Sequence, residues 1–146
     1  MNKQPSLFKI IMVDYMAFVG AIAPVSLWGV YIFLLLTKRE DISNLTIPII
    51  FGVLTVLGLI LLVWRIILIN NIFTDGIEAN ATISRVFFFR DRGKIECVYS
   101  YLGEKYVSSN KVLKFKFTTA LRSGMEVVVM VDRNKPKRAF IRDLYL

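Results

Sequence analysis

The chain has 146 residues, of which 55% are hydrophobic and 21% are charged, and its formal net charge is +8. Its mean hydropathy of +0.57 is too high for a disordered chain or an ordinary soluble domain. The sequence contains no histidine and one cysteine, which excludes histidine-based catalysis, the common zinc sites, disulfide frameworks and cysteine-pair redox chemistry. The length suits one domain, or a membrane anchor joined to one small domain.

Two long apolar runs occupy the first half of the chain. Tyr15–Leu36 is a run of 22 residues without a charge, and Leu45–Trp64 is a second run of 20. As helices they would be about 33 and 30 Å long, which matches a hydrocarbon core of about 30 Å. Both are apolar on every face, and the remaining chain is too short to bury them. We therefore expect a basic tail over residues 1–9 and membrane spans over about 10–36 and 45–69.

A cleaved signal peptide is the alternative interpretation of the first run, because Ala21–Ala23 resembles a small-residue cleavage site. Asp14 interrupts the short apolar stretch, and Pro24 would follow the cut directly. The run then continues to spanning length, which favours a membrane span.

The two runs are joined by eight polar residues, Thr37 to Asn44, and so short a connection predicts an antiparallel helical hairpin within residues 10–70. Ser43 or Asn44 is expected to cap the second helix. Small residues of the first run, around Gly20, are expected to pack on the second helix or on a partner helix. Lys and Arg residues near the ends of the spans favour a cytoplasmic location for both termini.

Three residues are predicted to mark the membrane interface: Asp14, Trp64 and Arg65. Asp14 follows Lys9 closely enough to lie beside it at the level of the lipid headgroups. Arg65, at the end of the second run, is expected to extend to the lipid phosphates. The alternative for Asp14 is an intramembrane acid in a proton path or in a pair between subunits.

From Ile77 onward the apolar residues alternate with a period of two, which predicts β-strands. The expected strands cover about residues 77–89, 95–101, 106–117, 125–131 and 138–141. Five short antiparallel strands suggest a small closed or nearly closed barrel of the OB or SH3 type over residues 71–146, because closure protects the strand edges. The expected fold class is thus a membrane α + β protein.

Several segments of this half carry a resemblance to a known family: Asp75–Gly76, Ala79–Ile83, Tyr99–Tyr101, Gly103–Tyr106, Gly124–Val129 and the turn from Asp132 to Pro136 with Ala139. They resemble the domain-of-unknown-function 3592 family, which consists of bacterial membrane proteins with spanning helices and a small β domain. The likeness covers about half of the chain, and Val131–Arg133 replaces the Tyr-Asp-Pro run usual in the family. The resemblance implies a bacterial cytoplasmic membrane protein and transfers no catalytic residue, since the family has no established activity.

The sequence offers no set of reactive residues. The carboxylates of the second half lack the spacing of metal ligands, and Asp132–Asn134 is better explained as a turn than as a calcium loop. Cys97 lies among strand residues and is interpreted as a small buried apolar side chain rather than a nucleophile. We therefore predict no catalytic residue, no metal and no cofactor.

Charge is the remaining signal. From Asn70 onward 14 Lys and Arg residues face 8 acids, and two basic groups stand out: Lys111, Lys114 and Lys116; and Arg133, Lys135, Lys137 and Arg138. These groups are predicted to contact anionic lipid or a protein partner. A nucleic acid is disfavoured, because Phe115 and Phe117 alternate with lysines and are expected to point into the core.

By elimination, the expected function is that of a non-enzymatic, membrane-anchored accessory or scaffold protein. Its β domain would contact a protein partner or anionic lipid at the membrane surface, and a homo-oligomer is a further possibility. The alternative is a component of a membrane enzyme or transport assembly that uses Asp14 or Cys97.

Overall fold

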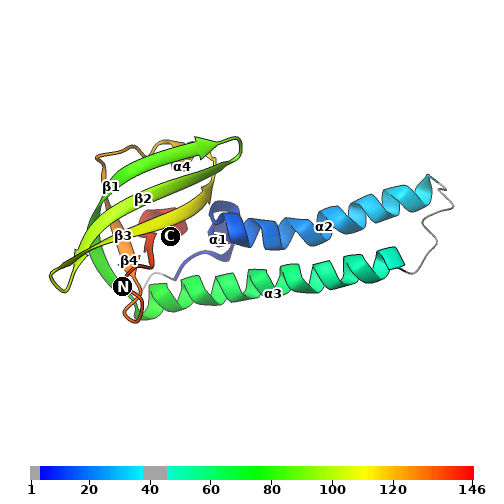
Figure 1. Cartoon of the computed structure of the whole chain (residues 1–146), viewed down its shortest axis with the longest axis horizontal. Helices are drawn as coiled ribbons and strands as arrows, with labels where there is room; N and C mark the ends of the chain where they lie inside the picture. Colours follow the sequence, from blue (N-terminus) through cyan, green and yellow to red (C-terminus); the bar gives the residue numbers. More distant parts are fainter. Residues whose placement is uncertain (1–3, 38–45) are drawn as a thin grey trace.

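The computed structural model describes residues 4–37 and 46–146, and it has two parts, a hairpin of long helices and a five-stranded sheet (Figure 1). The helices are α1 (Leu7–Val13), α2 (Tyr15–Leu36), α3 (Thr46–Asp75), α4 (Lys116–Thr119) and α5 (Arg142–Tyr145). The long helices α2 and α3 run side by side in opposite directions, as predicted, and the sheet lies at the end where α2 begins and α3 ends (Figure 1). The expected caps Ser43 and Asn44 lie outside the described residues.

The helix bounds differ from the expected spans at two points. Helical structure begins at Leu7 and is interrupted at Asp14, whose backbone is extended and whose side chain accepts a hydrogen bond from the Ala17 N–H at 3.0 Å. An aspartate in this position caps the helix that follows, so one expected helix becomes two. Helix α3 continues to Asp75, beyond the expected end of the second span at residue 69.

The long helices are apolar and exposed. Both are long and apolar enough to cross a membrane, which confirms the sequence interpretation at that level. In the most apolar stretch of α2 only 6% of the residues are buried within the chain, and in that of α3 the figure is 0%. The most apolar stretches of both helices are therefore not buried within this chain.

The helices of the hairpin approach each other closely at Gly20 and Gly58. A Cβ atom added at Gly20 would lie 2.8 Å from the carbonyl oxygen of Gly58, and one at Gly58 would lie 3.4 Å from that of Gly20. Further along the hairpin the Trp28 indole N–H donates to the Thr55 hydroxyl at 2.9 Å. Small residues at a helix interface allow the backbones to pack in this way, so the predicted role of the Gly20 region is confirmed within the chain.

Replacing Gly20 by leucine should therefore push the two helices apart and destabilise the full chain in detergent micelles by about 1–3 kcal/mol, the usual cost of overpacking. A Cβ atom added at Gly29, on the same helix, would meet no neighbouring atom of the described residues within 4 Å, so Gly29→Leu is the matched control. Thermal unfolding followed by circular dichroism measures both. Equal unfolding temperatures for the two variants would contradict the proposed contact.

The sheet is antiparallel throughout, with the strand order β3-β2-β1-β4-β5. The strands are β1 (Ile77–Phe89), β2 (Arg92–Tyr101), β3 (Glu104–Leu113), β4 (Glu126–Val131) and β5 (Ala139–Ile141). The edge strands β3 and β5 approach each other, so the sheet is nearly closed. This confirms the predicted barrel-like sheet, while its assignment to the OB or SH3 type stays a prediction.

The third predicted strand is too long. Strand β3 ends at Leu113, and the short helix α4 follows it. The cause is local, because the Thr118 hydroxyl donates to the carbonyl of Leu113 and accepts from the N–H of Phe115, both at 2.8 Å. Such side-chain bonds compete with strand pairing. The expectation that Phe115 and Phe117 point into the core is consequently wrong, since Phe115 is only partly buried and Phe117 is 48% exposed.

One hydrophobic core joins the helices to the sheet. The inward residues of the strands include Ile83, Ile95 and Cys97, and all three are almost fully buried. Helix α1 adds Ile10 and Val13 to the same core, and α3 and α5 also contribute buried side chains. The predicted domain boundary at residue 71 falls inside α3. Because side chains of α1, α3 and the strands share one core, the hairpin and the β domain pack together as one unit.

Candidate functional site

A buried ion pair lies where the hairpin meets the sheet. The Arg65 guanidinium of α3 donates from Nε to Asp14 Oδ1 at 2.9 Å and from Nη2 to Oδ2 at 2.7 Å. Asp14 is 1% exposed and the Arg65 side chain 16%. Two parallel bonds of this kind fix both side chains in one geometry. With the additional bond from Ala17, the Asp14 carboxylate has three donors.

Aromatic rings from the end of the chain enclose this pair. The Arg65 guanidinium lies over the Phe140 ring, 5.0 Å from its centroid, and that ring meets the Tyr145 ring edge to face at 5.6 Å. The Tyr145 phenol is fully buried, and burial together with the nearby negative charge of Asp14 raises its pKa well above the ordinary value. The Asp14 backbone also forms a β-bridge with Val112 of β3. The cluster thus connects α2, α3, β3, β5 and α5.

This geometry changes the roles expected for both charged residues. The Asp14 carboxylate binds Arg65 instead of Lys9, which is exposed, and the Arg65 guanidinium binds within the chain instead of extending to lipid phosphates. The location of these residues and of the half-exposed Trp64 at a membrane interface stays a prediction. The sequence did carry a signal for the pair, because the two residues lie at similar distances from the connection of the hairpin.

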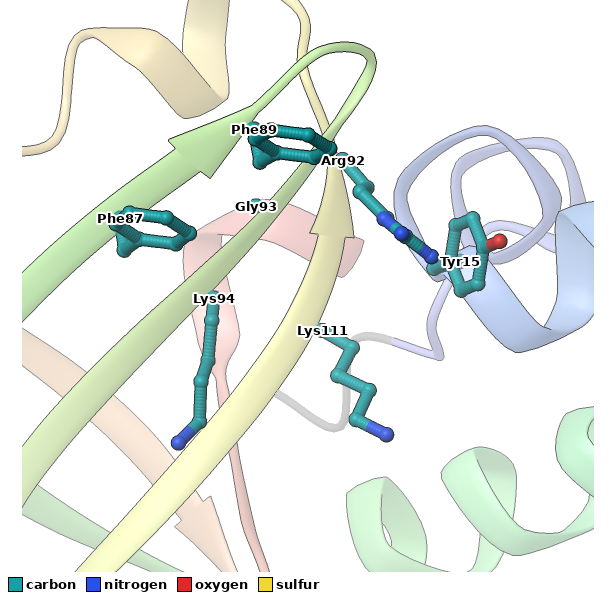
Figure 2. Close-up of a pocket in the computed structure, with 7 residues that line it drawn as sticks. All are labelled: Tyr15, Phe87, Phe89, Arg92, Gly93, Lys94 and Lys111. Carbon is teal, nitrogen blue, oxygen red and sulfur yellow. The ribbon is translucent and has the colours of Figure 1, made fainter.

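A second site is a pocket of about 340 Å³ on the outer face of the sheet, beside the start of α2 (Figure 2). The residues that line it come from four elements: Tyr15 of α2, Phe87 and Phe89 of β1, Arg92, Gly93 and Lys94 of β2, and Lys111 of β3. The Arg92 guanidinium reaches toward the Tyr15 ring and lies 5.8 Å from its centroid (Figure 2). We call this the cationic pocket, because three positive side chains surround an apolar floor.

The two basic groups predicted from sequence lie in different places. In the first group, Lys111 lines the cationic pocket and Lys114 follows β3, its N–H donating to the carbonyl of Asp91 at 2.9 Å, while Lys116 begins α4. Arg92 and Lys94 were missed, because they are separated in sequence from Lys111 and reach it only through strand pairing.

The second basic group forms the connection between β4 and β5 and contains Arg133, Lys135, Lys137 and Arg138. Asp132 accepts hydrogen bonds from the N–H groups of Asn134 and Lys135 at 2.9 and 3.3 Å, and Arg138 lies 3.7 Å from the same carboxylate. Asp132 therefore closes a turn, as predicted.

Cys97 is 0% exposed, which confirms its interpretation as a core side chain. Burial raises the pKa of its thiol from 9.0 to about 11. Burial, with a contribution from the neighbouring Cys97, also raises the pKa of Tyr99 from 10.0 to about 12. The Tyr99 hydroxyl donates to the carbonyl of Pro136. A thiolate is the reactive form of cysteine, so this environment opposes a role as a nucleophile.

The raised pKa values of Cys97 and Tyr99 predict alkaline instability. The unfolded chain loses these protons near pH 9.0 and 10.0, whereas the folded chain keeps them to about 11 and 12. The contribution of these two groups to the free energy of unfolding is therefore fully present below pH 9, and it should be lost as the pH rises from 9 to about 12. Chemical denaturation of the full chain in detergent micelles between pH 7 and 12 measures the effect. In Cys97→Ala the earliest part of the decline should disappear, and an unchanged pH profile would contradict the assignment.

Among residues 4–37 and 46–146, no three His, Cys, Asp or Glu side chains come together in a way that could hold a metal ion. Comparison with family models, with curated proteins and with solved structures finds no match to this chain. The resemblance to the domain-of-unknown-function 3592 family therefore stays a prediction from sequence.

Proposed function

We propose that this protein is a non-enzymatic accessory or scaffold protein anchored in the bacterial cytoplasmic membrane. In this proposal α2 and α3 cross the bilayer, both termini lie in the cytoplasm, and the β domain contacts a protein partner or anionic lipid at the membrane surface. A homo-oligomer is compatible with the same arrangement.

The exposed surface of the hairpin supports membrane anchoring. Residues on one side of α3 form a groove that is almost entirely apolar: Val56, Leu59, Ile60, Val63, Trp64 and Ile67. Apolar surfaces of this extent are rare on soluble monomers and are ordinary where a helix faces lipid.

The rigid joint between hairpin and sheet is the observation that carries the scaffold proposal. The Asp14–Arg65 pair joins the start of α2 to α3, and the Asp14–Val112 bridge, the Arg65–Phe140 contact and the shared core hold the β domain against these helices. Helix α3 leads through Gly76 directly into β1, without the flexible linker expected between independent domains. A module held this way keeps a fixed orientation relative to the two long helices.

The alternative function, chemistry by Asp14 or Cys97 in a larger assembly, has less support. The Asp14 carboxylate is occupied by three donors, and the Cys97 thiol is buried with a raised pKa. Both arrangements are typical of structural residues.

Extraction of membranes with alkaline carbonate tests the anchoring. The full chain should remain in the membrane pellet and should require detergent for release, and its release by carbonate would overturn the proposal.

Reporter fusions test the proposed orientation. Alkaline phosphatase fused after Leu146 should be inactive, whereas a fusion between residues 37 and 44 should be active, because only the connection between the two helices would be translocated.

A further inference from the structure

We propose that the cationic pocket binds the phosphate group of an anionic membrane lipid, an inference that rests on the proposed membrane anchoring. The pocket lies on the outer face of β1, β2 and β3, beside the first residue of α2 (Figure 2). The bound group would be a phosphodiester, with its glycerol and acyl part against the aromatic rings.

The charges in the pocket favour an anion. Lys94 and Lys111 are directly opposed across the β2–β3 pair, and like charges in this position destabilise a sheet. Glu96 takes up part of this charge, since its carboxylate lies 2.6 Å from Lys94 Nζ. Within the described ranges, neither Arg92 nor Lys111 has a carboxylate within salt-bridge distance. A phosphate between these two side chains would therefore neutralise charge that the chain leaves uncompensated.

The aromatic side chains favour a lipid over a soluble phosphate. Phe87 and Phe89 lie on the same face of β1, and they are 59% and 51% exposed. Rings exposed to this extent beside a cluster of cations suit the boundary between headgroups and acyl chains, where apolar surface and positive charge are satisfied together. A site for free phosphate would gain nothing from this apolar surface.

The position of the pocket agrees with the same ligand. Tyr15 both begins α2 and lines the pocket, so the pocket lies at the level where α2 would leave the hydrocarbon core. The lipid phosphates lie immediately outside that core. Basic side chains at this depth are attracted to the anionic cytoplasmic leaflet.

Binding of short-chain lipids to the purified full chain in neutral detergent micelles tests this proposal. Dihexanoyl phosphatidylglycerol should raise the thermal unfolding temperature in a saturable manner. The same concentrations of dihexanoyl phosphatidylcholine or of inorganic phosphate should not. An equal shift with inorganic phosphate would indicate a soluble-phosphate site, and an equal shift with phosphatidylcholine would indicate a merely apolar contact; either result overturns the proposal.

Two matched triple variants locate the site. Arg92→Gln/Lys94→Gln/Lys111→Gln should raise the half-saturating concentration of phosphatidylglycerol at least tenfold, because each basic residue near an anionic surface contributes about fivefold in binding. Arg133→Gln/Lys135→Gln/Lys137→Gln removes the same number of charges from the β4–β5 connection, which does not line the pocket and is assigned in this proposal to a protein partner. This variant should change the half-saturating concentration less than twofold. An equal loss of phosphatidylglycerol affinity in both variants would indicate diffuse electrostatic attraction and would overturn the proposal of a specific site in the pocket.

Folding and anchoring are checked separately. Without lipid the pocket variant should unfold at a temperature close to that of the parent chain, because relief of the repulsion between Lys94 and Lys111 offsets the loss of the Lys94–Glu96 pair and of the Arg92–Tyr15 contact. Failure of the proposed membrane anchor would appear as release by alkaline carbonate, which involves no pocket residue. A chain that stays in the membrane but shows no preference for phosphatidylglycerol contradicts only the lipid site.

Discussion

Replacing Arg65 by methionine should destabilise the full chain by about 3–5 kcal/mol, the cost of leaving a buried carboxylate without its partner. The expected loss is large because Asp14 is 1% exposed and water cannot replace the two bonds from the guanidinium. Denaturant unfolding in detergent micelles, followed by circular dichroism, measures the change. Arg133→Met, at an exposed position, is the control and should stay within about 0.5 kcal/mol of the parent.

A double-mutant cycle separates the ion pair from other effects of these substitutions. Asp14→Asn keeps an oxygen that can accept from the Ala17 N–H, so it preserves the cap of α2 while removing the charge. The double variant Asp14→Asn/Arg65→Met should be less destabilised than the sum of the single variants, with a coupling of about 1–3 kcal/mol. Additive effects would mean that the pair does not couple the start of α2 to α3 energetically.

Replacing Gly76 by alanine should cost about 3 kcal/mol or more, the upper end for overpacking. A Cβ atom at this position would lie 2.1 Å from the carbonyl oxygen of Ile72 and 2.8 Å from that of Val131, and backbone atoms cannot move aside as a flexible side chain can. The Gly76 N–H also donates to the carbonyl of Ile72 at 2.9 Å, which closes the end of α3.

The same denaturant measurement tests Gly76→Ala, with Gly52→Ala as its control. Gly52 lies on α3, and a Cβ atom added there would meet no neighbouring atom of the described chain within 4 Å, so alanine should be neutral or slightly stabilising. If Gly76→Ala unfolds like the parent chain, the junction between α3 and β1 must relax more easily than its geometry indicates.

The elements that were predictable are those whose signal is periodic and local. The long apolar runs predicted α2 and α3, and the alternation from Ile77 onward predicted the sheet. The end of β3 was not predictable from alternation, because Thr118 redirects the backbone through its own hydroxyl although the period continues through Phe117. Local hydrogen bonding overrode the pattern at that point.

The sites depended on pairings over long distances in sequence. Asp14 meets Arg65 only after the hairpin has closed, and the cationic pocket exists only after three strands have paired beside Tyr15. Composition could show an excess of positive charge in the second half of the chain, but it could not show which of those charges lie on one face. Register supplies that information, as the opposition of Lys94 and Lys111 illustrates.

The continuity of α3 has a mechanical consequence. Its 30 residues correspond to a rod about 45 Å long, and its last turns are buried in the core with the strands through Ile69, Ile72 and Phe73. A hairpin embedded in a bilayer adjusts its tilt to the thickness of the hydrocarbon. Because the end of α3 is packed in the core of the β domain, any such tilt would rotate the sheet with the helices and alter the height of the exposed Phe87 and Phe89 rings above the lipid. Bilayer thickness would thereby change how deeply these two rings enter the headgroup layer.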